Sequence, residues 1–493
     1  MKSLVWCVVA AGAGAIASLN FAPLRVPGAF LLALVVLFFA LRQAPVQASG
    51  VASAAVSGAF AASFYGIGMW WLNAVSPAAW AALWAALVVL HAFLGIALRL
   101  VMRLAWWPVW AASLWTGADL LRSTVPFKGF PWLRLSHTVL DTPAEGVVAW
   151  MGLTATTWLM ASVAATFVFV TETRSWRPLV PVVVVTLLAF AAPSGLAHTG
   201  GTPETLRIAA VQGNTPGPFG TWAFGDILRL HVDETQRITR DVDLVVWPEN
   251  ASDMDIRTDT YARDLVSTAA QSVGAPILVG AILDGPTSDT ALNASLLVSP
   301  ESGPSDDMYV KRFVVPYGEF VPFRRFLGNL VPRFDREIPR DMLAGTEPGA
   351  LRAANTIVGT TICWDIAHDA ALRGSVKAGA SFIAVQTSNA TFADFGPGVQ
   401  PEQQWDISRL RAIETGRWVV VASTNGVSGF INPDGDIIEQ LPVRTAAHGI
   451  EEISLANSET WATRVGGHVS WLIGALALTG LVVGIVKRRK ESS

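Results

Sequence analysis

The sequence predicts a multi-pass α-helical membrane domain of about eight transmembrane helices, joined to an extracytoplasmic α/β sandwich domain. Three observations support this fold class. Hydrophobic residues make up 52% of the 493 positions and charged residues only 15%, whereas about a quarter of an ordinary soluble protein is charged. Residues 1–200 hold 14 charged side chains, but residues 201–466 hold 54. The second region also changes to short β-rich segments that alternate with helical ones.

Apolar segments of roughly 20 residues, the length that crosses the hydrocarbon core, define the membrane domain. Seven of them precede the α/β region and an eighth follows it. They lie near residues 4–21, 26–41, 50–72, 78–98, 104–121, 147–170, 179–197 and 468–486. The second is short and the fifth contains Asp119, and a count wrong by one would invert the topology. The expected domains are residues 1–200 with seven helices, 201–466, and 467–493 with the eighth helix and a basic tail.

Basic residues in the short loops predict the orientation, because Lys and Arg tend to remain on the cytoplasmic side. With the N-terminus inside, the cytoplasmic segments carry ten Lys and Arg residues and the outer loops carry four. Seven spans then place residues 201–466 on the extracytoplasmic face, with both termini in the cytoplasm. Residues 1–20 could instead be a cleaved signal peptide. A first transmembrane helix is the simpler interpretation, since further spans follow at once.

Charge and cysteine content exclude several classes of protein. The net charge of −3 removes the electrostatic case for nucleic-acid binding. The two cysteines, Cys7 and Cys363, cannot form a disulfide framework, and the Cys and His clusters of a zinc site are absent from the sequence. We therefore expect no metal and no cofactor.

The α/β domain is predicted from apolar strands bounded by Gly, Pro and Asn. Strands are expected within residues 206–214, 243–250, 275–283, 291–300, 355–365, 381–389 and 418–426, and helices within 226–240, 260–273, 366–379 and 402–416. Nearly continuous apolar strands that alternate with helices indicate sheets covered on both faces.

Polar residues that end apolar strands mark the expected site, because functional side chains of α/β domains gather there. Glu249 ends one strand and Cys363 another, and Lys311 is one of only two lysines in residues 201–466. A thiol must lose its proton to attack a carbonyl. Glu249 could take that proton and Lys311 could stabilise the oxyanion. Taken singly, a lone cysteine at a strand end is more often a buried packing residue, and a glutamate at a strand end is commonly a helix cap.

Taken together, the motifs resemble a known family. WPEN around Glu249, YVKRFVVPYGEFVPF around Lys311 and ICWD around Cys363 occur in this order. They are similar to the Glu-Lys-Cys signature of the nitrilase, or carbon-nitrogen hydrolase, superfamily. With seven spans before the domain and one after it, the chain resembles the apolipoprotein N-acyltransferases of that superfamily. Further similarity lies in VQGN (211–214), GFPW (129–132), RLRAIETGR (409–417) and STNG (423–426).

The resemblance implies an α-β-β-α nitrilase-like sandwich and a role for each matching residue. Glu249 would be the general base, Lys311 the oxyanion stabiliser, Cys363 the nucleophile and Glu319 a second acid that helps to orient the site. The implied substrate-binding residues are Trp222, Trp364, Asp365 and Asn389. The chain departs from the family pattern at Asp365, where a glutamate is usual, and at Ala390, where an aspartate is usual, which puts substrate preference in doubt more than reaction type.

The reaction implied by the resemblance is the last step of bacterial lipoprotein maturation. A membrane phospholipid would donate an acyl chain to Cys363 as a thioester. The α-amine of the N-terminal S-diacylglyceryl-cysteine of a lipoprotein would then accept it. The enzyme would be an integral protein of the bacterial cytoplasmic membrane, monomeric, with no cofactor and no nucleic-acid partner.

Two other functions compete with this one. A membrane-anchored amidase of the same superfamily would keep Glu249, Lys311 and Cys363 but hydrolyse a small amide. A transporter or binding module with an inactive domain would not need these residues. A Cys-His pair with His368 is disfavoured by its spacing on a helix. The segment 321–334 alternates apolar and arginine residues, which suits either the bilayer interface or an ordinary surface loop.

Overall fold

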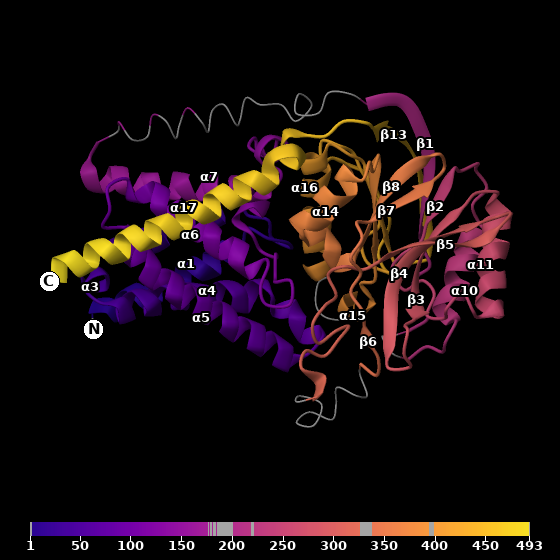
Figure 1. Ribbon diagram of the computed structural model, residues 1–493, viewed down its shortest axis with the longest axis horizontal. Helices are drawn as coiled ribbons and strands as arrows, with labels where there is room; N and C mark the ends of the chain where they lie inside the picture. The colour runs from indigo at the N-terminus through magenta and orange to yellow at the C-terminus, as the bar shows by residue number, and fades with distance from the viewer. Residues whose placement is uncertain are drawn as a thin grey trace. The chain divides into compact units, whose positions relative to one another are not determined.

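The computed structural model divides into a helical unit and an α/β unit. It describes residues 2–175, 177, 180, 184, 201–217, 221–325, 338–393 and 399–492. The helical unit comprises Met1–Ala197 together with Trp461–Ser493, and the α/β unit comprises His198–Thr460. The described strands all belong to the α/β unit (Figure 1).

Helices of the first unit coincide with the apolar segments expected among the described residues. They are α1 (Lys2–Ser18), α2 (Ala29–Arg42), α3 (Ala44–Gln47), α4 (Gly50–Gly68), α5 (Pro77–Val101), α6 (Trp107–Arg122), α7 (Val147–Thr173) and α17 (Trp461–Ser492), with short 3-10 helices η1 (Trp70–Ala74) and η2 (Leu135–Val139). Within the described part of the chain, 4 helices are long and apolar enough to cross a membrane, namely α4, α5, α7 and α17, while α1 and α2 are shorter apolar helices. The expected span 179–197 lies outside the described residues except at 180 and 184. The count of eight spans therefore stays a prediction.

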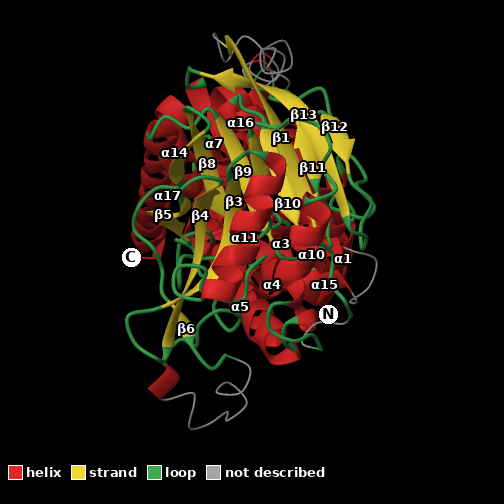
Figure 2. Cartoon of the chain, turned by 90° about the vertical axis from the view of Figure 1, so that its right-hand side faces the viewer, coloured by secondary structure: helices red, strands yellow, loops and turns green. Residues whose placement is uncertain are grey.

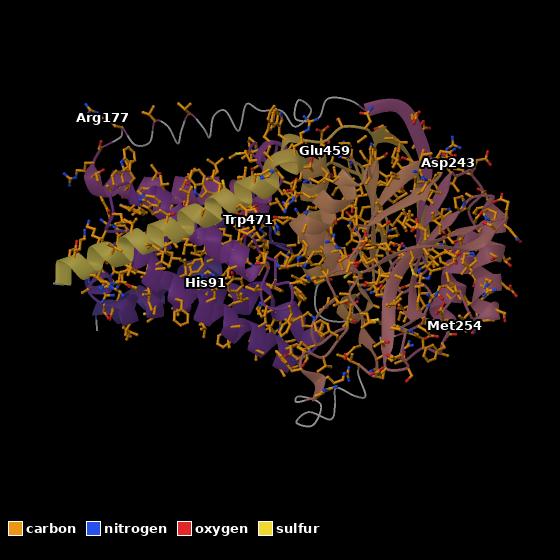
Figure 3. The ribbon with its side chains drawn as sticks, in the orientation of Figure 1. His91, Arg177, Asp243, Met254, Glu459 and Trp471 are labelled. Carbon is orange, nitrogen blue, oxygen red and sulfur yellow. The ribbon has the colours of Figure 1, made fainter. Side chains whose placement is uncertain are left out.

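Large apolar side chains cover the outside of α17. Trp471, which Figure 3 labels, is 83% exposed, and Leu472 and Leu478 are also exposed. Such a surface is unfavourable in water but suits lipid, where apolar residues face outward.

Asp119, the acidic residue within the fifth expected span, is neutralised by two arginines. Its carboxylate lies 2.5 Å from a guanidinium nitrogen of Arg122 and 2.9 Å from Nε of Arg134, and all three side chains are buried. Arg122 also donates hydrogen bonds of 2.7 Å to the carbonyls of Phe130 and Trp132. A charge buried in a membrane helix needs such partners. Arg122 therefore both neutralises Asp119 and holds the GFPW loop.

Two sheets form the centre of the α/β unit. The 7-stranded sheet has the order β13-β1-β2-β3-β4-β5, with β6 paired to β4, and the 6-stranded sheet has the order β12-β11-β10-β9-β8-β7. The first contains β1 (Gly201–Gln212), β2 (Leu244–Val246), β3 (Ile277–Asp284), β4 (Thr290–Ser299), β5 (Gly303–Val310), β6 (Asp341–Met342) and β13 (Ala447–Ala456). The second contains β7 (Ala350–Ala353), β8 (Thr356–Ile362), β9 (Phe382–Thr387), β10 (Val419–Ser423), β11 (Gly429–Ile431) and β12 (Ile437–Gln440).

Helices cover the outer face of each sheet, which confirms the predicted α/β sandwich. Helices α10 (Asp226–Thr235) and α11 (Thr260–Val273) lie over the first sheet, as Figure 2 shows, and α14 (Asp369–Lys377) and α16 (Val399–Thr415) lie over the second. A layer of apolar side chains, including Leu244, Leu278 and Phe382, fills the space between the sheets. The sequence did not predict β5, β6, β7 or β11–β13, which are short, edge-lying or only partly apolar.

The order of the strands decides where the site lies. Strands β1, β2 and β3 run parallel, as do β8, β9 and β10. Residues that follow β2 and β8 therefore emerge at the carboxyl ends of parallel strands, where α/β proteins place their functional groups.

Candidate active site

Glu249, Lys311 and Glu319 form one hydrogen-bonded cluster, in which Glu249 and Lys311 are buried and the Glu319 side chain is 15% exposed. Glu249 follows β2 and Lys311 follows β5 directly. The ammonium of Lys311, which is 1% exposed, donates bonds of 2.9 Å to Oε1 of Glu249 and of Glu319. Burial alone would lower the pKa of Lys311, but the two carboxylates outweigh it and hold that pKa well above its ordinary value. Lys311 is therefore a fixed cation at neutral pH.

The carboxylates are held on both of their oxygens. Nδ2 of Asn293 donates bonds of 2.8 Å to Oε1 of Glu249 and Oε1 of Glu319. Oε2 of Glu249 accepts from the amide of Ser388 at 2.9 Å, and Oε2 of Glu319 accepts from the amide of Val315 at 2.7 Å. This restricts the rotation of both side chains. Sequence reasoning missed Asn293. Strand β4 also contains Thr290, Ser295 and Ser299, so a further polar residue there gave no distinct signal.

Cys363 begins the 3-10 helix η3 (Cys363–Ala367) directly after β8. The backbone φ of Cys363 is 47°, in the left-handed region that residues other than glycine rarely adopt. The backbone therefore turns sharply at this residue. Burial raises the pKa of this thiol to about 12, and Glu249 adds to the effect, whereas Lys311 and a hydrogen bond with the Thr387 hydroxyl oppose it. The resting thiol is thus protonated and lies within electrostatic reach of both Glu249 and Lys311.

Comparisons with known proteins agree with this geometry. Residues 13–166 match the model of the apolipoprotein N-acyltransferase N-terminal domain, and residues 207–463 match the carbon-nitrogen hydrolase model. An apolipoprotein N-acyltransferase of Mycolicibacterium smegmatis is 32% identical over 461 residues, which cover 87% of this chain and 76% of that protein. The chain belongs to the apolipoprotein N-acyltransferase family.

More distant relatives carry the same name. An apolipoprotein N-acyltransferase of Pseudomonas syringae is 27% identical and aligns over 88% of both chains. Among solved structures, a nitrilase-superfamily amidase from Nesterenkonia is 17% identical with a TM-score of 0.40, covering 54% of this chain and 97% of the amidase.

In this member of the N-acyltransferase family, Asp365 supports the loop that carries Cys363. Its buried carboxylate accepts bonds from the Tyr309 hydroxyl at 2.6 Å and from the amides of Ile362 and Phe313 at 3.1 Å. Burial raises the pKa of Asp365 to about 6, although Lys311 and the bonds from Tyr309 and the two amides oppose the shift. The carboxylate that was expected to contact substrate is thus occupied by groups of the protein.

The other expected substrate-binding residues differ in exposure. Trp222 and Trp364 are partly exposed. Asn389 is buried, where its amide nitrogen donates to Gln400 at 3.0 Å and to Gln404 at 3.1 Å, and its oxygen accepts from Ser423 at 2.7 Å. Only the two tryptophans of this set therefore present a surface to a ligand.

His368 packs in the wall of the site, where its ring stacks on Phe313 at 3.9 Å between ring centroids. This contact accounts for its burial without a Cys-His pair. The segment expected at the bilayer interface is described only as far as Arg325. Its apolar residues Phe326, Leu327, Leu330 and Val331, together with Arg333, lie outside the described residues.

Arg411 on α16 anchors the far end of η3 in this acyltransferase fold. The fully buried guanidinium donates to the carbonyls of Ile366 at 2.9 Å and Ala367 at 2.6 Å. It also pairs with Asp369 at 2.8 Å and with Glu414. Asp365 and Arg411 therefore hold the loop that carries Cys363 from opposite ends. Among the residues that the structure describes, no group of three or more His, Cys, Asp or Glu side chains is arranged to hold a metal.

Proposed function

We propose that this protein transfers an acyl chain from a membrane phospholipid to the α-amine of the S-diacylglyceryl-cysteine that begins a lipoprotein. The observation that carries the proposal is the Lys311 ammonium, fixed between Glu249 and Glu319 beside the one thiol of the α/β unit. The site occurs in a chain whose helical part matches the N-terminal domain of the acyltransferase family.

The first step forms the acyl-enzyme. Glu249 takes the proton of the Cys363 thiol as the sulfur attacks the ester carbonyl of the phospholipid. Lys311 stabilises the resulting oxyanion, and the bond to Glu319 keeps the ammonium charged and in place while Glu249 is protonated. The oxyanion then collapses, the ester C–O bond breaks, and the proton on Glu249 passes to the leaving lysophospholipid. An acyl-thioester on Cys363 remains.

The second step transfers the acyl chain to nitrogen. The neutral α-amine of the lipoprotein attacks the thioester carbonyl, and Glu249 accepts a proton from the attacking nitrogen. When the C–S bond breaks, this proton returns to the sulfur and regenerates the thiol. An amine displaces a thioester far more readily than an oxygen ester, which is the chemical advantage of the cysteine.

The raised pKa of the Cys363 thiol fits this order of events. Because burial keeps the thiol protonated at rest, acylation requires a base, and Glu249 removes the proton as the sulfur attacks the ester. Trp222 and Trp364, the partly exposed members of the expected substrate set, are assigned to the acyl chain. Asp365 and Asn389, whose side chains are bonded to other groups of the protein, are assigned a structural role in holding the site together.

The membrane part supplies access to the acyl donor. We assign eight transmembrane helices to the protein, with the α/β unit on the extracytoplasmic face of the bacterial cytoplasmic membrane and both termini in the cytoplasm. The excess of Lys and Arg in the cytoplasmic segments supports this orientation. We further expect the protein to act as a monomer.

A labelled phospholipid tests the proposal. The purified full-length protein is incubated in mixed micelles with a phospholipid labelled in its acyl chain, and the protein is then analysed for a label that hydroxylamine removes. Wild type should acquire the label and release lysophospholipid. A synthetic S-diacylglyceryl-cysteinyl peptide, added next, should discharge the label onto its own α-amine.

The two cysteines provide the matched pair of variants. Cys363→Ala should lose the adduct, whereas Cys7→Ala, in α1, should retain it. Folded wild-type protein that forms no adduct would refute the acyltransfer mechanism. Release of ammonia from small amides, without lysophospholipid, would identify the protein as an amidase instead.

A further inference from the structure

Gln386 lies on the strand next to the one that leads to Cys363, and its side chain bonds to the backbone that leads to Glu249. On β9 it lies in register with Ile362, the residue before Cys363. Its side chain is fully buried and crosses to the other sheet, where Nε2 donates to the carbonyl of Trp247 at 2.7 Å and to that of Leu278 at 3.1 Å. Trp247 is two residues before Glu249.

The two residues after Gln386 contact the reacting groups themselves. The Thr387 hydroxyl lowers the pKa of the Cys363 thiol, and the amide of Ser388 donates to Oε2 of Glu249 at 2.9 Å. The end of β9 thus contacts the nucleophile, the base and the backbone that carries the base.

The backbone before Glu249 needs the donor that Gln386 supplies. Strand β2 ends at Val246, and Pro248 has no amide hydrogen with which to extend the ladder. Without Gln386, the Trp247 carbonyl would be buried without this bond, at a cost of about 1–3 kcal/mol. On the opposite side, the Pro248 carbonyl lies so close to Gly280 that a Cβ there would approach it to 2.2 Å. The segment is therefore held from both sides.

Apolar packing alone would not define the separation of the two sheets as sharply. The surrounding layer consists of aliphatic and aromatic side chains whose contacts are non-directional. A hydrogen bond has preferred distances and angles, so the two bonds from Gln386 specify how β9 lies against the end of β2 and the start of β3.

We infer that Gln386 is a positioning residue that sets the placement of Glu249 relative to Cys363. The inference rests on the proposed function for its role in acyl transfer, but the geometry itself can be tested without any lipid. Gln386 does not touch the reacting atoms, so it acts through Trp247 and through the end of β9.

Gln386→Met removes both hydrogen bonds at nearly constant volume. We expect the rate of acyl-adduct formation to fall about 100-fold, since a misplacement of about 1 Å in a catalytic group has an effect of that size. Gln212→Met is the control, because the Gln212 side chain is also fully buried, donates to the carbonyls of Pro442 at 2.8 Å and Thr445 at 2.9 Å, and accepts a 2.7 Å bond from the Ser428 hydroxyl. It should lower the melting temperature to a similar extent but keep the wild-type rate.

Alkylation of Cys363 by iodoacetamide reports on the same geometry without substrate. Because the Glu249 charge raises the pKa of the thiol, displacement of Glu249 should speed alkylation near neutral pH. Gln386→Met should therefore alkylate faster while it acylates more slowly, and Gln212→Met should match wild type in both. Equal rates for the two variants in both assays would overturn the inference. If wild type forms no adduct but the alkylation difference appears, the positioning role stands and the acyltransfer proposal fails.

Gln386→Glu tests the positioning role of Gln386 if Gln386→Met does not fold. A protonated carboxyl can donate one hydrogen bond to the Trp247 carbonyl, but an ionised carboxylate cannot donate. As the pH rises from about 5.5 to 8.5, the alkylation rate of Gln386→Glu divided by that of wild type should therefore increase. The corresponding ratio of acylation rates should decrease. A ratio that stays constant over this range would contradict the assignment of Gln386.

Discussion

The ammonium of Lys311 donates a 2.9 Å hydrogen bond to Oε1 of Glu249, although 62 positions separate these residues in the chain. The proposed base and the proposed oxyanion stabiliser are thus already paired before substrate binds. Pairing of this kind places charge where it develops in the transition state and limits reorganisation during the reaction. It also makes each partner sensitive to loss of the other, because a buried charge left alone is costly.

Replacement of Lys311 should affect both stability and catalysis. Lys311→Met leaves the buried Glu249 carboxylate and the partly buried Glu319 carboxylate without their cation, and we expect a loss of about 3–5 kcal/mol in unfolding free energy. Loss of an oxyanion-stabilising group should also lower the rate of adduct formation by a factor on the order of 100–1,000 in protein that remains folded. Thermal unfolding and the labelled-phospholipid assay measure the two effects. Lys377→Met, which removes an exposed lysine of the same unit, should change neither.

Glu249→Gln should change acylation and alkylation in opposite directions. The amide cannot accept the thiol proton, so acyl-adduct formation should fall by at least about 100-fold, as expected for loss of a general base. The negative charge that raises the pKa of Cys363 is also gone, so iodoacetamide should alkylate the thiol faster at neutral pH. Parallel time courses with the two reagents measure this. A variant slowed equally in both would indicate a collapsed site and not the loss of a base.

Asp365 should make the fold less stable as the pH rises from about 4 to 6. Burial raises its pKa in the folded protein to about 6 from an ordinary value of 3.8, so the unfolded chain releases the proton first. The native state then has to ionise a carboxyl that burial disfavours, at a cost on the order of 3 kcal/mol. Melting temperatures from pH 4 to 7.5 should show this loss for wild type and a smaller one for Asp365→Asn. Asp284→Asn, at an aspartate that is 66% exposed, should follow wild type throughout.

Arg411→Lys should loosen the loop that carries Cys363. Lysine keeps the charge but cannot donate at once to Ile366, Ala367 and Asp369 as the planar guanidinium does. We expect a loss on the order of 3 kcal/mol in stability and slower acylation. Arg409→Lys, two positions earlier on α16, is the control, since Arg409 donates to the carbonyl of Gly435. If Arg411→Lys acylates and melts like Arg409→Lys, Arg411 does not support the loop.

Residues that end apolar strands could be recognised from the sequence. Glu249 and Cys363 follow apolar runs, and Lys311 is one of two lysines in residues 201–466. Each of these residues therefore gives a local signal in the sequence. Asn293 and Gln386 are equally polar and equally buried, but they lie inside strands that also contain buried Ser or Thr residues, Ser295 in β4 and Thr387 in β9. The partners of Asn293 and Gln386 are 44 and 139 positions away, and no local pattern predicts which carbonyl or carboxylate they meet.

The sequence by itself determined the apolar helical part, the α/β class of the second part and the residue types capable of acyl transfer. These follow from hydrophobic periodicity and from the chemistry of single side chains, which are local properties. Only the tertiary structure decided that Lys311 pairs with both Glu249 and Glu319, that Asp365 is occupied by Tyr309 and that Gln386 spans the two sheets. Hydrogen bonds act over about 3 Å, so such pairings exist only once strands that are distant in the chain have packed together.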